Sequence, residues 1–472
     1  MKRSLKALLQ TSVVWFWILN AFRLASGLIL LPLVLRVFTK ADLGMYYVLL
    51  SLAALTPLID FGFGNTIGRF VSYAMGGAET LQAHGVATSS ILKGPNYPLL
   101  WQLLRTTRAL YRYLTLALLV ILGIWGTYMV ELRIYETSSP LITRLAWITT
   151  LGSTLFDIYS NWWDVFLRGM NEVRAAARIV VAALTLKFAV SVALLLGGAG
   201  LLSIPLATLV SCVLQRQLAR RRCLALLKEE PLATRHNLKE NLKILWPNSW
   251  RIGIHSISSY LTVNANLAIC VHAFGLAANG KYGLSVQLMS IAAGMASVWL
   301  LTKWPLINQL QARGEPASVR RTFWSRLWLQ NATFLPLTAG IVFVIPWLLR
   351  WFGSGKTVLP LIWLLGLTLT TFLDLQFSSW GTLISTANRV PYLWPSVATN
   401  IVSLTLSLIL VHFPSLGLGA LVLGPLLAGS AFNYWYWPLF GARSLGTSLF
   451  RFLFLGPTHA AAANSARPTV HT

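Results

Sequence analysis

Apolar runs of about 20 residues recur along nearly the whole chain, and they constrain its fold more than any other feature. A helical run of this length crosses the hydrocarbon core of a bilayer at about 1.5 Å per residue. The runs lie at residues 12–36, 42–63, 110–130, 142–166, 176–197, 199–215, 244–271, 279–304, 327–350, 358–384, 390–412 and 416–440. We therefore predict an all-α integral membrane protein with about 12 transmembrane helices.

The composition excludes an ordinary soluble protein. Of 472 residues, 56% are hydrophobic and only 11% are charged, whereas a soluble domain carries about 25% charged residues. The formal net charge of +25 would suit nucleic acid only if basic residues and aromatic residues shared an exposed face. Because the basic residues here lie mainly between apolar runs, we predict no nucleic acid partner.

The distribution of positive charge predicts the orientation in the membrane. Most of the 38 Lys and Arg residues fall in the alternate segments that are cytoplasmic when the N-terminus is inside. Cytoplasmic segments of membrane proteins carry this excess of positive charge. Both termini are therefore predicted to be cytoplasmic, with the polar segments 77–109 and 313–326 as cytoplasmic connectors.

The longest polar stretch of the central region divides the chain into two halves. We predict four parts, namely an N-terminal six-helix bundle, a cytoplasmic linker, a C-terminal six-helix bundle and a cytoplasmic tail, at residues 1–215, 216–243, 244–440 and 441–472.

A register of 236 residues supports an internal duplication. It aligns residues 37–46 with residues 273–282, and four of the ten aligned positions are identical, beginning with Phe38 and Phe274 and ending with Tyr46 and Tyr282. With six helices in each half, both halves enter the membrane from the same side. We expect a pseudo-two-fold axis along the membrane normal and a substrate cavity between the halves.

Four of the predicted spans carry polar stripes, in which polar residues recur every three or four positions and so share one helical face. The members that we single out are Asn20 and Arg23; Asp157 and Asp164; Asn248, Arg251 and His255; and Asp374. An unpaired charge at the centre of a span costs about 2.5–3.5 kcal/mol. These side chains are therefore predicted to face the interior of the protein.

Two interpretations of these stripes remain open. In the first, Arg23 and Arg251 present cations to an anionic substrate in a cavity that Asn20, Asn248 and His255 also line. The aspartates Asp157, Asp164 and Asp374 would then balance charge or bind a coupling ion. In the second, arginines and aspartates pair between helices and only fix the packing.

The sequence predicts no cofactor and no metal site. Cys212, Cys223 and Cys270 lack the spacing of metal ligands. The outer segments are too short to carry a catalytic domain, so the chain is predicted not to be an enzyme.

The first two spans and the segment around residues 166–179 resemble bacterial polysaccharide or O-antigen flippases, the Wzx-type branch of the MOP superfamily. The resemblance rests on a polar first helix, on Gly44 and Tyr46, on Asp60 and Gly62, and on the arginines that precede the fifth span.

The resemblance implies a MATE-like, V-shaped pair of bundles in the bacterial inner membrane. Such a protein moves a polyprenyl-pyrophosphate-linked oligosaccharide from the cytoplasmic to the outer leaflet by alternating access. Its partners would be membrane lipids and the polysaccharide polymerase and glycosyltransferase machinery. Arg23 and Arg251 would suit the pyrophosphate.

Two other functions remain open. One is a cation-coupled multidrug or metabolite antiporter of the same superfamily. The other is a membrane glycosyltransferase or polymerase, which would need catalytic side chains on a substantial outer loop.

Overall fold

The computed structural model describes residues 12–53, 56–83, 85, 94–227, 238–351 and 357–456, and every regular element in these ranges is helical. The helices of the first part of the chain are α2 (Ser12–Val37), α3 (Lys40–Ala53), α4 (Thr56–Ile59), α5 (Phe63–Met75), α6 (Tyr97–Ile121), α7 (Thr127–Glu131), α8 (Pro140–Ser160), α9 (Trp162–Gly169), α10 (Val173–Leu196) and α11 (Ser203–Leu226). The helices that follow are α12 (Leu238–Leu301), α13 (Trp304–Ala312), α14 (Pro316–Ala339), α15 (Ile345–Trp351), α16 (Leu361–Ser385), α17 (Leu393–Leu410), α18 (Ala420–Ala431) and α19 (Asn433–Ser444).

Short π and 3-10 turns connect or end several of these helices. They are η1 (Leu122–Gly126), η2 (Ile134–Glu136), η3 (Gly200–Leu202), η4 (Gly340–Val344), η5 (Gly417–Gly419) and η6 (Arg451–Leu455).

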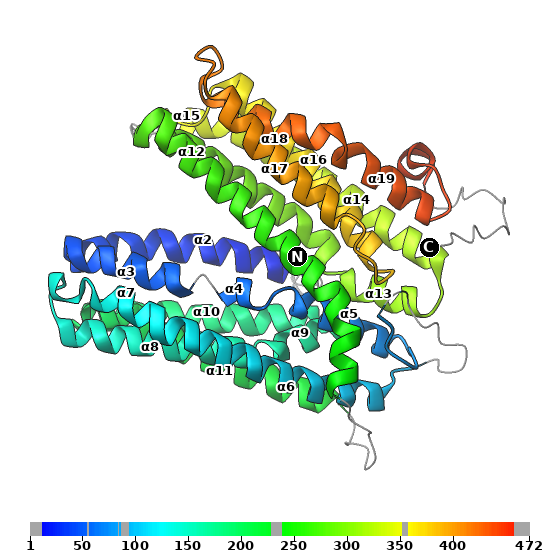
Figure 1. Ribbon diagram of the computed structural model, residues 1–472, viewed down its shortest axis with the longest axis horizontal. Coiled ribbons are helices and arrows are strands. Elements are labelled where there is room, and N and C mark those ends of the chain that lie inside the picture. The colour runs from blue at the N-terminus through cyan, green and yellow to red at the C-terminus, as the bar shows by residue number, and fades with distance from the viewer. Residues whose placement is uncertain are drawn as a thin grey trace, which may run out of the picture. The chain divides into compact units, whose positions relative to one another are not determined.

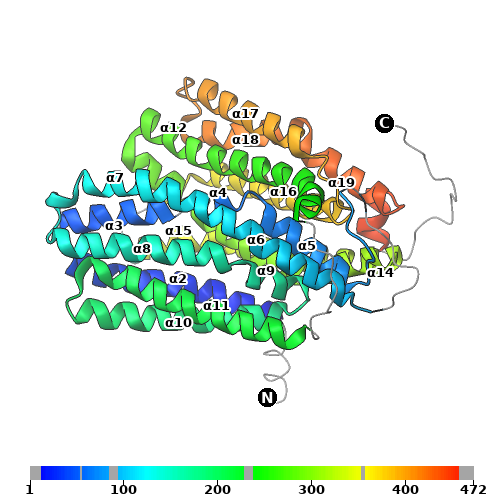
Figure 2. The same ribbon diagram turned by 60° about the horizontal axis from the view of Figure 1, so that its bottom comes forward.

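The chain forms two compact units. Unit 1 comprises Met1–Ile257 and Trp304–Arg313, and unit 2 comprises Ser258–Lys303 and Gly314–Thr472. In unit 1, α10 packs between α2 and α11, and α11 also packs on α8, so that these helices lie side by side (Figures 1 and 2). In unit 2, α17 packs on α18, and α16 packs on α18 and α19. The bounds predicted for the two bundles, the linker and the tail stay a prediction.

Each of the 12 predicted spans coincides with helix in the structure. Within the described residues, 9 helices are long and apolar enough to cross a membrane. The other three predicted spans fall on α2, on α3 with α4, and on α8 with α9. The prediction of an all-helical membrane protein is confirmed.

Two predicted connectors are in fact partly helical. α6 already begins at Tyr97, where the Asn96 side chain caps the helix by accepting a hydrogen bond from the Leu99 amide at 3.1 Å. α14 begins at Pro316. Hydropathy alone placed both boundaries too late, because the first turns of these helices carry arginines and extend beyond the apolar run.

The end of the first span and its counterpart in the second half both interrupt a helix. Residues 38 and 39 separate α2 from α3. In the second half, Gly275 has a φ of 78° and divides α12 into two helical parts. Glycine adopts this backbone conformation without a steric penalty. The register of 236 residues places Gly275 opposite Thr39. The structure thus interrupts a helix at both of the positions that this register aligns, and the duplication itself stays a prediction.

Candidate functional site

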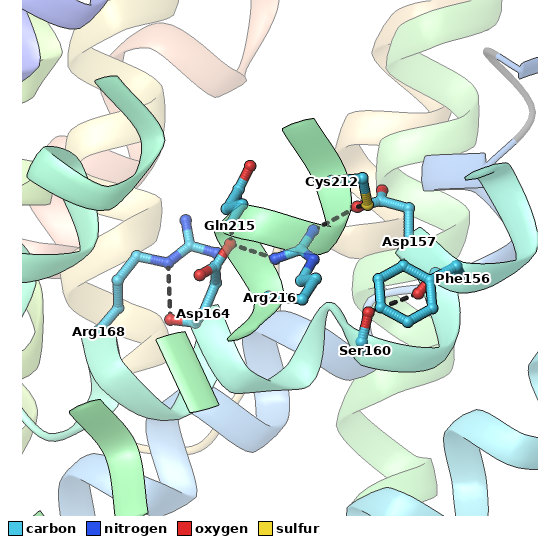
Figure 3. Close-up of polar contacts among 8 residues, drawn as sticks. All are labelled: Phe156, Asp157, Ser160, Asp164, Arg168, Cys212, Gln215 and Arg216. Carbon is cyan, nitrogen blue, oxygen red and sulfur yellow. Dashed lines mark hydrogen bonds and ion pairs between the residues drawn. The ribbon is translucent and has the colours of Figure 1, made fainter. Parts of the chain in front are cut away.

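A buried arginine joins two of the predicted aspartates inside unit 1 (Figure 3). The Arg216 guanidinium donates a hydrogen bond to the Asp157 carboxylate at 2.5 Å and another to the Asp164 carboxylate. The Gln215 amide donates to Asp164 at 2.6 Å, and the Cys212 thiol donates to Asp157 at 3.3 Å. We call Asp157, Asp164, Cys212, Gln215 and Arg216 the polar cluster.

Helical periodicity assembles the polar cluster. Residues 212, 215 and 216 lie three and four positions apart, so they share one face of α11. Asp157 lies near the end of α8, and Asp164 lies in the first turn of α9. Because α11 packs against both helices, its polar face meets the two carboxylates.

The polar cluster is unevenly exposed. The side chains of Arg216 and Asp164 are 6% and 9% exposed, whereas that of Asp157 is 42% exposed. Asp164 Oδ1 and Arg216 Nε are both buried. Within the described residues, Asp164 Oδ1 accepts no hydrogen bond and Arg216 Nε donates none. One end of the cluster is therefore closed and tightly paired, and the other end opens at Asp157.

The sequence pattern did not single out Arg216, because this residue falls at the start of the polar linker predicted after the sixth span. The structure continues α11 through Arg216 to Leu226 and buries the guanidinium among the two carboxylates. The available signal was the helical spacing of Cys212, Gln215 and Arg216. Asp157 and Asp164 thus pair with an arginine of another helix, and their coupling role stays a prediction.

A second carboxylate contact lies where α4 meets α5. The Tyr111 hydroxyl donates to Asp60 Oδ1, and the Gly64 amide donates to Asp60 Oδ2 at 3.0 Å. Tyr111 is fully buried. Asp60 is thereby held by two donors, although the sequence had marked it only through the family resemblance.

The predicted residues of α12 in unit 1 lie next to this turn. Asn248 is fully buried and donates from Nδ2 to the Ala83 carbonyl at 2.8 Å. The Arg251 guanidinium lies over the Trp250 ring, 5.4 Å from its centroid, which is a cation–π distance. His255 is half-buried one turn further along the same helix.

Two glycines allow α12 to approach this turn closely. A Cβ at Gly253 would lie 2.8 Å from the Phe61 carbonyl oxygen. A Cβ at Gly62, whose φ is 77°, would lie 2.7 Å from the Ser249 carbonyl oxygen. The backbones therefore touch, and this contact fixes the segment of α12 that carries Asn248 and Arg251.

We expect Gly253→Ala to destabilise the protein by about 1–3 kcal/mol, because the added methyl group would overlap backbone that cannot move freely. The matched control is Gly294→Ala in the other part of α12, where nothing lies within 4 Å of the added Cβ. The Gly294→Ala protein should be more stable than the original by about 0.5–1 kcal/mol, because alanine has a higher helix propensity than glycine. Thermal unfolding in lipid nanodiscs measures both, and equal melting temperatures of the two variants would contradict the close contact.

The other predicted residues are placed as follows. Asn20 is half-buried in α2. The backbone of Arg23 belongs to the same helix, but its side chain lies outside the described residues. Asp374 in unit 2 is exposed and accepts a hydrogen bond from the Tyr434 hydroxyl at 2.8 Å. The cavity and coupling roles of all these residues stay predictions.

The described acidic side chains of the candidate site are held by hydrogen bonds and ion pairs. Throughout the described part of the chain, no group of three or more His, Cys, Asp or Glu residues is placed to hold a metal ion. The aspartates are held by arginine or tyrosine, as described above, whereas Arg251 lies on an aromatic ring. Unit 1 thus presents an arginine on α12 beside a charge-paired interior.

Known proteins resemble this chain in fold but not in sequence. No protein-family model and no curated protein matches the sequence. Among solved structures, an outward-facing multidrug resistance MATE family transporter of the MOP superfamily matches with a TM-score of 0.70 and 13% identity, over 93% of this chain and 97% of that chain. MATE in its bent conformation matches with a TM-score of 0.69 and 13% identity, over 94% and 95% of the two chains.

A third solved structure shares the fold. A MOP superfamily transporter from Pyrococcus furiosus Vc1, described as having a binding pocket of reverse polarity, matches with a TM-score of 0.68 and 12% identity, over 93% of this chain and 97% of that chain. The match covers almost the whole of each chain, so both units belong to a single known architecture. The chain is a multi-pass, all-helical membrane protein with the fold of the MATE and MOP superfamily transporters.

Proposed function

We propose that this protein is a transporter of the MOP superfamily that moves a polyprenyl-pyrophosphate-linked oligosaccharide from the cytoplasmic to the outer leaflet of a bacterial inner membrane. The motion would be alternating access, with Arg251 as one of the groups that bind the pyrophosphate. Asn20, Arg23, Asn248 and His255 would line the path of the polar headgroup.

The proposal rests on the surroundings of the Arg251 side chain. Within the described residues, no ion pair joins Arg251 to a carboxylate, and its guanidinium lies over Trp250. A half-buried cation without an internal counterion can pair with an anion from outside the protein. A guanidinium can donate two parallel hydrogen bonds to a phosphate, which suits a pyrophosphate better than a point charge would.

The contacts of three aspartates in unit 1 also favour an anionic substrate. Asp157 and Asp164 both pair with Arg216, and Asp60 is held by Tyr111. A cationic substrate would need a carboxylate that has no such partner. The Pyrococcus furiosus protein shows that pocket polarity can differ on this fold, so an anionic cargo is compatible with the architecture.

A second candidate is a cation-coupled antiporter for drugs or metabolites, and Asp374 is the observation that favours it. This carboxylate is exposed and, within the described residues, accepts one hydrogen bond, from the Tyr434 hydroxyl. One of its oxygens therefore remains available for a cation or a proton. The multidrug resistance protein with the same fold adds to this possibility.

The charge of the cargo separates the two candidates. In proteoliposomes with an imposed potential that is negative on the proposed cytoplasmic side, each negative charge that moves to the opposite side gains about 2.3 kcal/mol per 100 mV. We expect movement of a pyrophosphate-linked oligosaccharide lipid, faster with the potential than without it, and none of an uncharged lipid with the same glycan. Export of cationic dyes in exchange for protons or Na⁺, without lipid movement, would favour the antiporter.

A further inference from the structure

The chain that follows α19 folds back onto α14 within unit 2. The Arg320 guanidinium donates to the Leu445 carbonyl at 3.0 Å. The indole groups of Trp324 and Trp328 both donate to the Leu453 carbonyl, at 3.4 and 3.1 Å. We call Leu445–Leu455 the return segment; it is red in Figure 1.

The return segment is amphipathic. Phe452 is fully buried, and its ring lies 6.0 Å from the ring of Phe323 and 5.4 Å from that of Trp380. Phe450 and Phe454 point away from this core, being 68% and 66% exposed, and their rings lie 4.9 Å apart. One aromatic side chain thus anchors the segment while two others form an uncovered apolar face.

Tryptophans along α14 and α15 give the depth of the return segment in the membrane. Trp328 and Trp347 are 42% and 56% exposed, and indole rings favour the headgroup boundary. The 19 positions that separate residues 328 and 347 correspond to about 28 Å of helix, close to the hydrocarbon thickness of about 30 Å. Trp328 therefore marks one boundary, and the Leu453 carbonyl bonded to it lies at the same depth.

This boundary carries positive charge without negative charge. Residues 316–328 and 433–456 contain five arginines and no aspartate or glutamate. The three that are exposed are Arg321, Arg443 and Arg451. Within the described part of unit 2, no ion pair joins them to a carboxylate. Their counterions therefore come from outside this part of the protein.

We propose that the return segment, together with Arg321 and Arg443, binds the headgroups of anionic phospholipids. The guanidinium groups pair with lipid phosphates, and the rings of Phe450 and Phe454 lie among the first acyl carbons. The predicted orientation places this end of α14 in the cytoplasmic leaflet, where anionic lipids concentrate. None of these residues is among those proposed for the transport path.

Retention of lipid by the full chain tests this proposal. Native mass spectrometry compares bound phosphatidylglycerol with bound phosphatidylcholine for the intact chain and for Arg321→Gln/Arg443→Gln/Arg451→Gln. An arginine near a membrane surface contributes about 1 kcal/mol, which is about fivefold in affinity, so the triple variant should lose about a hundredfold. Arg451→Gln alone should lose about fivefold. The matched control is Arg350→Gln, an exposed arginine at the opposite end of the same span, which should retain lipid normally.

Two results would overturn the proposal. One is equal retention of phosphatidylglycerol by the intact chain, Arg451→Gln and the triple variant. The other is displacement of the bound lipid by millimolar inorganic pyrophosphate, which would assign these arginines to the cargo instead. Retention that falls in the variants and resists pyrophosphate supports a phospholipid site.

Discussion

Replacing Arg216 with methionine should destabilise the protein by about 3–5 kcal/mol, the usual effect of removing one partner of a buried ion pair. The Asp164 side chain is 9% exposed and would remain as an uncompensated charge. The Asp157 side chain is 42% exposed, so water would replace much of what it loses. Thermal unfolding of the full chain in nanodiscs measures the effect as a large drop in melting temperature.

Variants of the two carboxylates provide the controls for Arg216. Asp164→Asn should destabilise more than Asp157→Asn, because burial is deeper at residue 164. The triple variant Arg216→Met/Asp157→Asn/Asp164→Asn should recover most of the lost stability, since no buried charge remains. If Arg216→Met melts like the intact chain, or if the triple variant melts lower still, the polar cluster does not stabilise unit 1 through charge pairing.

The sequence predicted the membrane class because each span is long enough to show its own apolar run. The identities around Phe274 and Gly280 also lie where the structure breaks α12, and the duplication that they suggest stays a prediction. Glycine at residue 275 permits that break, but hydropathy carries no signal for a positive φ. The broken second span, with its turn at residues 60–62, was likewise hidden inside an apolar run.

The candidate site was predictable only in part. The stripe of Asp157 and Asp164 was visible as a periodic pattern, but its partner Arg216 was not. Hydropathy ends the sixth apolar run before residue 216, and an arginine there looks like the start of a cytoplasmic segment. Whether a charge is buried depends on the carboxylates of other helices, which one sequence does not reveal. The contact of Gly253 with Phe61 depends in the same way on tertiary packing.

Replacing Arg251 with alanine should reduce transport of a pyrophosphate-linked lipid by about 10–100-fold. The loss corresponds to the 1.5–3 kcal/mol of a hydrogen bond to a charged group, at about 1.4 kcal/mol per tenfold change. Arg251→Lys should keep part of the rate, because it retains the charge but not the forked geometry for phosphate. Proteoliposomes that contain each variant and a labelled lipid-linked oligosaccharide measure the rate directly.

The control for Arg251 should be an arginine of the same unit outside the proposed path. Arg36 is exposed in the last turn of α2, so Arg36→Ala should transport at the rate of the intact chain. The contact of the half-buried Arg251 guanidinium with Trp250 contributes about 0.5–2 kcal/mol, so Arg251→Ala should lower the melting temperature only modestly. A stable Arg251→Ala variant with full transport would remove Arg251 from the substrate path. A stable variant without transport ties the movement of the anion to this side chain, because folding alone cannot then explain the loss.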